Sequence, residues 1–274
     1  MPRAAVLGSP IAHSLSPVLH NAGYAALGLD DWSYECFETT AEELPERVGE
    51  SESDFRGFSV TMPGKFAALN FATEVTDRAR LMGSANTLVR LEGGGWRADN
   101  TDTEGIAGAL AELMGATPGT GRRALVIGAG GTARPALWGL AQRGYRDIDV
   151  LNRRDRMAEF AKLADALELN LTPVSYADNL RARVKQADVI VSTVPSAALT
   201  DHLEALSHAP VLDVIYDTLP TPLMAYTAAD GYPTVGGHIM LAHQSFSQFE
   251  QFTGLSAPRA AMVDALLEAL KKRD

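Results

Sequence analysis

The sequence predicts a mixed α/β protein in which an N-terminal α/β unit is followed by a doubly wound parallel sheet. Between residues 122 and 218, fully apolar strands alternate with helices, which is typical of a parallel sheet covered on both faces. Before residue 103, short strands and helices mix in a less regular order. This change of rhythm indicates two units rather than one continuous sheet.

The first hundred residues contain three predicted strands, two predicted helices and one hairpin. The strands are 3–8, 32–39 and 55–62, the helices are 16–29 and 41–51, and the hairpin spans 84–100 around three glycines. The helix that begins at residue 16 has clear start signals. Ser16 is a typical N-cap residue, and Pro17 fits the first helical position.

The second unit begins after a predicted connecting helix and linker at 103–121. Strands are expected at 122–127, 147–154, 187–195 and 210–218, and helices at 132–144, 155–168, 237–253 and 258–273. The last helix carries an apolar stripe made of Met262, Ala265, Leu266, Ala269 and Leu270. We therefore expect domains at 1–102 and 103–240, with helices at 241–274 packing back on the first domain.

Composition excludes several classes of protein. The chain has 274 residues, 46% of them hydrophobic, which is enough for a substantial core. A net charge of −10 argues against nucleic acid as a partner, but it still allows a small anionic ligand. No stretch has the length of a membrane span. The single cysteine, Cys36, fits a reducing cytoplasm, and the six histidines show no metal-ligand spacing, so no metal is expected.

A glycine turn at 128–133 predicts a dinucleotide site. The sequence GAGGTA follows an apolar strand and opens a helix, with Gly128, Gly130 and Ala133 at the positions of a dinucleotide-binding fingerprint. Gly128 permits the tight turn, Gly130 lets a pyrophosphate approach the backbone, and the helix N-terminus presents free amides to the anion. The alternative is a glycine turn of purely structural use.

The end of the next strand indicates which dinucleotide is bound. NAD enzymes usually place a carboxylate there to hold the ribose 2′-hydroxyl, whereas this chain has Asn152, Arg153 and Arg154, with Arg156 close behind. Guanidinium groups can bind a 2′-phosphate, so NADP is the predicted cofactor. Asp155 is the one residue here that does not fit this prediction, because its carboxylate would repel a phosphate. The alternative is that the arginines only begin a helix on a solvent-exposed face.

Lys65 and Asp102 each allow an ordinary and a chemical interpretation. In SVTMPGK, Pro63 and Gly64 end a strand and place Lys65 just beyond its C-terminal end, where most lysines are solvated. Asp102 follows Thr101 at the start of a predicted helix, where an acid is favoured by the helix dipole alone. The residues by themselves leave both interpretations open.

Other hydroxyl and amide side chains lie at predicted turns. Ser14 and Ser16 follow the first strand and could bind a carboxylate. Asn86 lies at the start of a strand, where its amide can both donate to and accept from a hydroxyl group.

Taken together, these motifs resemble the shikimate dehydrogenase family. The matching stretches, in family order, are SLSP, SVTMPGK, GSANT, ADNTD, GAGGTAR, LNRR, DVIYDT and GHIMLAHQS, and they span Ser14 to Gln244. The chain departs from the usual pattern at Ser59, where the family usually has Asn, at Gly64, and at Ala98–Asp99. None of these departures removes a group that the reaction needs.

The resemblance implies a two-domain enzyme with a Rossmann-type NADP domain that reversibly reduces 3-dehydroshikimate to shikimate in aromatic amino acid (chorismate) biosynthesis. It implies Lys65 and Asp102 as the catalytic pair, with Lys65 as proton donor and Asp102 orienting it. The implied substrate residues are Ser14, Ser16 and Tyr216 for the carboxylate, and Thr61, Asn86 and Gln244 for the ring hydroxyls. The implied cofactor residues are Gly128, Ala129, Gly130, Gly131, Thr132, Ala133, Asn152, Arg153, Arg154, Thr193, Val194, Ile215, Gly237 and Met240.

Three other functions compete with this one. A quinate/shikimate dehydrogenase would use NAD, which the pair Arg153–Arg154 argues against. An aminoshikimate enzyme is a further alternative within the family. A nonenzymatic NADP-binding sensor would have no need of Lys65 and Asp102. For assembly, the sequence favours a monomer or a homodimer.

Overall fold

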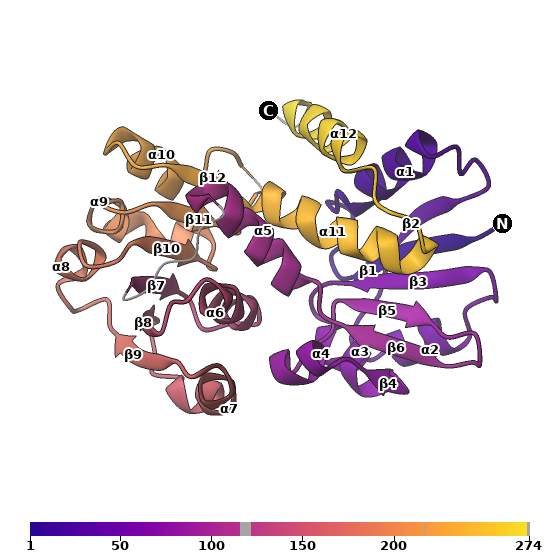
Figure 1. Ribbon diagram of the computed structural model, residues 1–274, viewed down its shortest axis with the longest axis horizontal. Helices are drawn as coiled ribbons and strands as arrows, with labels where there is room; N and C mark the ends of the chain where they lie inside the picture. The colour runs from indigo at the N-terminus through magenta and orange to yellow at the C-terminus, as the bar shows by residue number, and fades with distance from the viewer. Residues whose placement is uncertain (116–121, 217, 273–274) are drawn as a thin grey trace. The chain divides into compact units, whose positions relative to one another are not determined.

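The computed structural model describes residues 1–115, 122–216 and 218–272, and the chain divides into two compact units (Figure 1). The first unit consists of Met1–Asp102 and Leu241–Asp274, and the second is Thr103–Met240. The predicted linker at 116–121 lies outside the described residues. Each unit has its own six-stranded sheet.

The sheet of the first unit is mixed. Its strands are β1 (Arg3–Gly8), β2 (Ser33–Glu38), β3 (Phe55–Val60), β4 (Glu74–Val75), β5 (Thr87–Arg90) and β6 (Trp96–Asp99), in the order β2-β1-β3-β5-β6-β4. β1 is parallel to β2 and β3, whereas β5 is antiparallel to both β3 and β6. One core face is built by apolar side chains of these strands, among them Leu7, Phe58, Leu88 and Trp96. β3 ends at Val60, two residues earlier than predicted, because Thr61 begins a turn.

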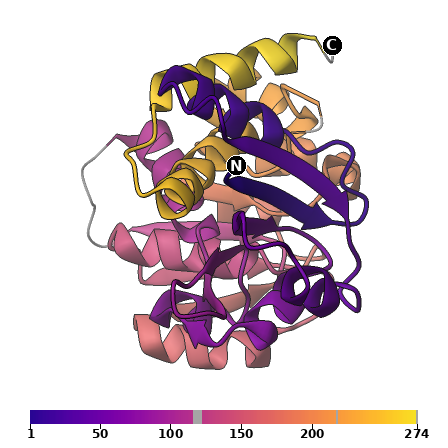
Figure 2. The ribbon, with the colours of Figure 1, turned by 90° about the vertical axis from the view of Figure 1, so that its right-hand side faces the viewer.

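The helices of the first unit come from both of its stretches of chain, the N-terminal one and the C-terminal one. They are α1 (Ser16–Ala26), α2 (Leu44–Gly49), α3 (Lys65–Phe71), α4 (Asp77–Met82) and α12 (Arg259–Lys271). α12 packs on α1, and Figure 2 shows the yellow α12 lying along the indigo α1. Met262 and Leu266 are fully buried, and Met262 Sδ lies close to Gly23, where a side chain would crowd it. The predicted return of the C-terminal helices to the first unit is confirmed.

One helix start differs from the prediction. Ser16 is the first residue of α1 rather than its cap, the N-cap is Leu15, and no side chain caps the helix. The nearby hydroxyl of Ser14 instead accepts a hydrogen bond from the Ser16 backbone N–H at 3.3 Å. The cap prediction failed because Ser14 and Ser16 both offer a hydroxyl at this turn, and the sequence pattern cannot choose between them.

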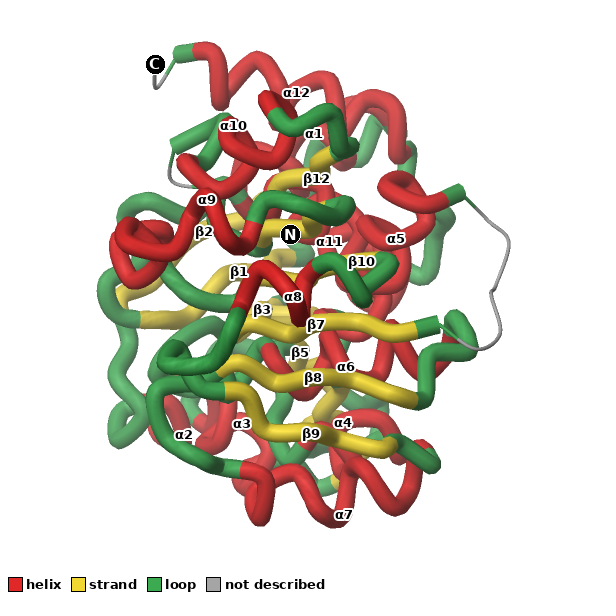
Figure 3. Tube along the Cα trace, turned by 90° about the vertical axis from the view of Figure 1, so that its left-hand side faces the viewer, coloured by secondary structure: helices red, strands yellow, loops and turns green. Residues whose placement is uncertain are grey.

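The sheet of the second unit is entirely parallel. Its strands are β7 (Arg123–Ile127), β8 (Asp147–Leu151), β9 (Asn170–Val174), β10 (Val189–Ser192), β11 (Val211–Asp213) and β12 (Thr234–Gly236). The order is β12-β11-β10-β7-β8-β9, the doubly wound arrangement with β7 and β10 at its centre. Figure 3 shows β10, β7, β8 and β9 side by side. The predicted fold class is therefore confirmed.

Helices connect these strands on both faces of the sheet. The connecting helices are α6 (Ala133–Gln142), α7 (Met157–Leu167), α8 (Leu180–Val184), η1 (Ser196–His202), α9 (Leu203–Leu206) and α10 (Pro222–Ala229), whereas α5 (Asp102–Met114) precedes β7 and α11 (Gly237–Thr253) follows β12. Two of them cross the boundary between the units. α5 begins with Asp102 of the first unit, and α11 begins in the second unit and ends in the first. In the described parts of the chain, no helix combines the length and apolar character needed to cross a bilayer.

Candidate active site

Topology gathers four loops of the first unit at one edge of its sheet. β1 and β3 are parallel neighbours, so the segments that follow Gly8 and Val60 leave the sheet at the same edge. β5 runs the opposite way and β6 reverses again, so Asn86, just before β5, and Asp102, just after β6, also lie at that edge. This edge therefore brings together polar residues that are far apart in the sequence.

Lys65 is held at this edge by its backbone. Thr61 N–H donates to the carbonyl of Leu7 at 2.9 Å, and Gly64 N–H donates to the carbonyl of Thr61 at 2.9 Å, which together form the turn after β3. Lys65 is then the first residue of α3, and its carbonyl accepts from Ala85 N–H at 3.0 Å. A backbone fixed on both sides leaves only the lysine side chain free to move.

Lys65 Nζ donates to Asp102 Oδ2 at 2.5 Å. The Asp102 side chain is 6% exposed, and the Lys65 side chain is 25% exposed. The other carboxylate oxygen, Asp102 Oδ1, accepts from Asn86 Nδ2 at 2.9 Å. Both oxygens of a buried carboxylate are thus occupied, while a quarter of the Lys65 side chain remains exposed.

Asn86 is the centre of the polar cluster at the sheet edge. Its side chain is 2% exposed. Besides Asp102, its Nδ2 group donates to Gln244 Oε1 and to Thr101 Oγ1, each at 3.0 Å. Its Oδ1 accepts from Thr101 N–H at 2.7 Å. Asn86 therefore ties the start of α5 to helix α11.

The predicted carboxylate-binding and hydroxyl-binding residues belong to the same edge, with one exception. Ser14 is half-buried, Ser16 is 5% exposed, and both lie in the segment that follows β1. Thr61 lies in the turn after β3, and its Cγ2 approaches the Gly8 backbone so closely that a Cβ on residue 8 would lie 2.4 Å from it. Tyr216 follows β11 in the second unit, so its role beside the serines stays a prediction.

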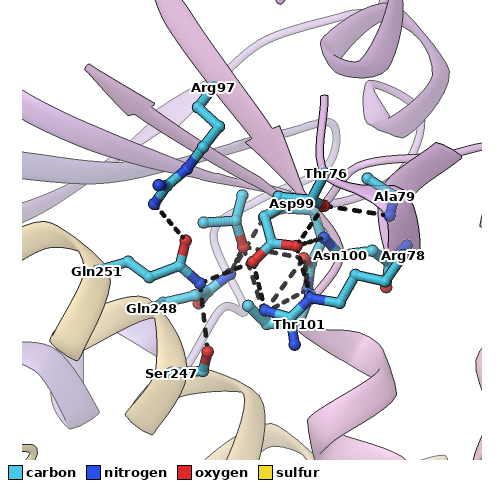
Figure 4. A network of polar contacts seen from close by, with 12 residues as sticks. Thr76, Arg78, Ala79, Arg97, Asp99, Asn100, Thr101, Ser247, Gln248 and Gln251 are labelled. Atoms are coloured by element: carbon cyan, nitrogen blue, oxygen red, sulfur yellow. Dashed lines mark hydrogen bonds and ion pairs between the residues drawn. The ribbon is translucent and has the colours of Figure 1, made fainter. Parts of the chain in front are cut away.

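Asp99 anchors the segment that leads into Asp102 (Figure 4). Its carboxylate accepts from Arg78, from Thr76 Oγ1 at 2.7 Å and from Gln251 Nε2 at 2.9 Å. Burial alone would raise the pKa of Asp99, but the Arg78 guanidinium and the other donors hold that pKa at about 2. The carboxylate therefore stays ionised and keeps the start of α5 in place.

The glycine turn of the second unit has the geometry of an anion site. Gly128 has a φ of +104°, and a Cβ there would lie 2.4 Å from Thr193 Oγ1, so only glycine fits. Gly130 and Gly131 are exposed, and a Cβ on either would meet nothing within 4 Å. The protein's own packing therefore does not require these two glycines. α6 starts at Ala133, and the side chain of its N-cap, Thr132, makes no capping hydrogen bond.

The residues beside this turn come from neighbouring strand ends. Thr193 and Val194 follow β10, and Thr193 Oγ1 donates to the carbonyl of Ile127 at 2.8 Å. Gly237 N–H donates to the carbonyl of Ile215 at 3.3 Å. A Cβ on Gly237 would lie 1.9 Å from the Val214 carbonyl oxygen, so this approach also requires glycine. Met240, one turn further along α11, is 8% exposed.

A cavity of about 340 Å³ lies after β8. It is lined by Val150, Asn152, Arg153, Arg154, Asp155, Met157, Pro173, Val174, Ser175 and Asp178. Arg153 and Arg154 are exposed, and their guanidinium groups form no hydrogen bond or ion pair with any described residue. Asn152 Nδ2 shapes the loop by donating to the Arg154 carbonyl at 2.9 Å.

Two neighbours of this arginine pair are engaged elsewhere. Arg156 forms a two-pronged ion pair with Glu159, at 2.6 and 2.5 Å. The discordant Asp155 accepts from Met157 N–H at 2.8 Å, so it stabilises the start of α7. The sequence could not assign either role, because both depend on where α7 begins.

Sequence reasoning missed one buried residue of the first-unit site. Gln248 lies on α11 four residues after Gln244, so both project from the same face of the helix. Its side-chain amide donates to the backbone carbonyl of Asn86 at 3.1 Å. The spacing of the two glutamines is the signal that could have found it.

Comparison with known proteins identifies the family. The sequence model of the shikimate dehydrogenase substrate binding domain matches residues 6–88, that of shikimate/quinate 5-dehydrogenase matches 112–212, and that of the shikimate 5′-dehydrogenase C-terminal domain matches 237–267.

In the described part of the chain, no group of three or more His, Cys, Asp or Glu residues is placed to hold a metal ion.

Solved structures and curated relatives agree with these matches. The crystal structure of Mycobacterium tuberculosis shikimate dehydrogenase is 48% identical, covers 98% of this chain and 100% of that one, and superposes with a TM-score of 0.91. Shikimate 5-dehydrogenase from Thermus thermophilus, solved with NADP(H) and shikimate, is 33% identical, covers 98% and 100% of the two chains, and has a TM-score of 0.82. The pentafunctional AROM polypeptide of Candida glabrata is 35% identical over 96% of this chain, which spans 18% of that polypeptide's length. The chain therefore belongs to the shikimate dehydrogenase family.

Proposed function

We propose that the chain catalyses the reversible, NADP-dependent interconversion of 3-dehydroshikimate and shikimate. The observation that carries the proposal is the contact between Lys65 Nζ and the buried carboxylate of Asp102, at the sheet edge where Ser14, Ser16 and Thr61 also lie. Residues 1–102 and the returning helices would bind the substrate, and residues 103–240 would bind the dinucleotide.

Lys65 supplies the proton in the direction of reduction. NADPH, when bound, supplies the hydride that adds to the ketone carbon. Negative charge then develops on the ketone oxygen, which an ammonium group can stabilise and protonate. In the direction of oxidation, the same nitrogen takes up the proton of the substrate hydroxyl. Asp102 accepts a hydrogen bond from Lys65 and fixes the direction in which Nζ points.

The substrate residues offer groups suited to a polyhydroxylated carboxylic acid. The hydroxyls of Ser14 and Ser16 can donate to the carboxylate, and Tyr216 is proposed to join them. Gln244 uses its Oε1 to accept from Asn86, so its Nε2 group can donate to a ring hydroxyl. Thr61 offers a further hydroxyl at the same edge.

NADP fits the second unit better than NAD. The open space at Gly130 and Gly131 and the uncapped first turn of α6 suit a pyrophosphate. Arg153 and Arg154 line a cavity and have no carboxylate partner among the described residues, so two guanidinium groups are available to a 2′-phosphate. The same observation argues against an NAD-dependent quinate enzyme.

The buried Asp102 contact with Lys65 argues against a sensor, which needs no such pair.

We further propose a cytoplasmic protein that is a monomer or a homodimer. The one cysteine, Cys36, is exposed and free, which suits a reducing compartment. Light scattering on the purified chain measures the assembly state.

The function is tested by four parallel rate assays, with shikimate or quinate as substrate and NADP or NAD as acceptor, followed by nicotinamide absorbance. We expect fast reduction of NADP with shikimate and much slower reaction in the other three assays. Faster turnover of quinate with NAD would contradict the proposed role of the arginine pair. No turnover in any assay, from folded protein, would favour the sensor or an amino-substituted substrate.

A further inference from the structure

Gln248 belongs to a buried hydrogen-bond network behind the candidate catalytic pair. Its side chain is 1% exposed and projects from α11 (Figure 4). Its Nε2 donates to the Asn86 carbonyl at 3.1 Å and to Thr87 Oγ1 at 3.0 Å, and its Oε1 accepts from Ser59 Oγ at 2.9 Å. Both hydrogens and the oxygen of this amide are therefore used inside the protein.

Backbone groups fix the orientation of both amides in the network. The Asn86 carbonyl can only accept, so Gln248 must present its nitrogen there and its oxygen to Ser59. Thr101 N–H can only donate, so Asn86 must present its Oδ1 there and its Nδ2 to the other side.

These two amide orientations direct the hydroxyl groups between them. Ser59 gives its hydrogen to Gln248, so it accepts from the Tyr34 hydroxyl at 2.6 Å. Thr87 receives a hydrogen from Gln248 and has two acceptors within reach of its own, Asn86 Oδ1 at 2.9 Å and Thr101 Oγ1 at 3.2 Å; the shorter contact favours Asn86. Burial raises the pKa of Tyr34, which keeps the phenol in its donating form. The hydrogen bonds that lead from Tyr34 through Ser59, Gln248 and Thr87 therefore all point toward Asn86.

The orientation of Asn86 decides how Asp102 is held. With Nδ2 toward Asp102 Oδ1, the amide donates to the carboxylate at 2.9 Å. A reversed amide would place an oxygen against the carboxylate, and the two groups would repel each other. The Asp102 carboxylate would then lose one of its two hydrogen bonds, and Lys65 Nζ would be held less firmly in its orientation.

We propose that Gln248 is a positioning residue for the reaction. Together with the Thr101 N–H, it acts through Thr87 and the backbone of residue 86 to hold the Asn86 amide with its nitrogen toward Asp102. This role rests on the proposed function, because it concerns the geometry of the proposed catalytic pair. Gln248 touches no reacting atom itself.

The first test replaces Gln248 by a residue of similar length without hydrogen-bonding groups. For Gln248→Met we expect kcat for shikimate oxidation to fall by about 10-fold to 100-fold, since misplaced catalytic groups cost rates of this order. KM for NADP should not change. A folded variant that keeps at least half of the kcat would overturn the proposal.

Gln251→Met is the matched control. Gln251 lies on the same helix, is half-buried, and donates to Asp99 at 2.9 Å. Asp99 keeps Arg78, Thr76 and the Asn100 N–H as donors when Gln251 is lost. We expect this variant to lose stability while kcat stays within twofold of the parent. An equal fall of kcat in both variants would mean that any disturbance of α11 has the same effect, and would also overturn the specific role.

Gln248→Glu supplies a readout that a purely structural role would not move. A neutral carboxyl keeps one O–H donor for Asn86 or Thr87, whereas an ionised carboxylate keeps none. We therefore expect kcat of this variant to fall with rising pH, through an ionisation that the parent lacks. A pH profile parallel to that of the parent would overturn the proposal even if Gln248→Met does not fold.

The parent chain, assayed in parallel, separates failure of this inference from failure of the proposed function. Turnover by the parent with a normal Gln248→Met variant counts against Gln248 alone. If the parent does not turn over shikimate, the proposed function fails, and a crystal structure of Gln248→Met decides the positioning role. Lengthening of the distance of 2.9 Å between Asn86 Nδ2 and Asp102 Oδ1 would support it, and an unchanged distance would overturn it.

Discussion

At the scale of single residues, Lys65 and Asp102 show why chemistry can be missed in a sequence. Each has an ordinary interpretation by itself, as a solvated lysine and as a first-turn acid. They are 37 positions apart, and they meet because β3, β5 and β6 pair in one register. Local patterns predict each strand but not which strands pair, so the contact itself could be expected only from the family resemblance, and the roles of the site residues stay proposals.

The catalytic role of Lys65 predicts a large loss of turnover without a loss of binding. For Lys65→Ala we expect kcat to fall by about 100-fold to 10,000-fold, the range for loss of a general acid. KM for shikimate should change little, because the substrate residues are elsewhere on the sheet edge. Steady-state kinetics of shikimate oxidation measures both constants. Lys162→Ala, at an exposed position of α7, is the control. Retention of most of the parent's turnover by Lys65→Ala would exclude the proposed role.

At the scale of elements, the apolar strands of the second sheet were predicted well and its two edge strands were not. β7, β8, β10 and β11 lie where continuous apolar sequence predicted them. β9 and β12 were missed. β9 is an edge strand with several exposed residues and a proline at position 173, and β12 is only three residues long, so neither has the burial that produces an apolar run.

The loop after β8 carries a prediction about cofactor choice. We expect the double variant Arg153→Ser/Arg154→Ser to raise KM for NADP by about 100-fold to 1,000-fold, because each of the two charged hydrogen bonds to a phosphate contributes on the order of 2 kcal/mol. KM for NAD should not rise, since NAD has no 2′-phosphate. Arg156→Ser is the matched control, because Glu159 already engages that guanidinium. Equal effects on NADP and NAD would count against a 2′-phosphate site.

At the scale of the whole molecule, two buried ionisable groups make the first unit sensitive to acid. His20 is fully buried and stacks on Tyr34, with ring centroids 4.1 Å apart. Burial lowers the pKa of His20 to about 3 from its usual 6.5. The pKa of Asp99 is also lowered, to about 2. In both cases the unfolded chain binds a proton at a pH where the folded chain does not.

Stability should therefore fall as the pH is lowered. A group whose folded pKa is depressed contributes its full stability above its unfolded pKa and loses it as the pH falls toward the folded value. Between pH 6 and pH 4, His20 alone should lower the free energy of unfolding by roughly 1 kcal/mol per pH unit. Urea unfolding followed by circular dichroism at several pH values measures this slope. His20→Phe should flatten it, whereas an unchanged slope in that variant would show that other groups cause it.

The first unit is assembled from two stretches of chain that are separated by the whole of the second unit. During synthesis, the ribosome translates residues 103–240 before α12, so the second unit can complete its core first. The first unit meanwhile lacks α12, whose Met262 lies close to Gly23 of α1, and it also lacks Gln244 and Gln248 beside Asn86. In a nascent chain of this length, the second unit could therefore be folded while the active site of the first unit is still incomplete. Catalytic competence would arrive only with the last helices to be translated.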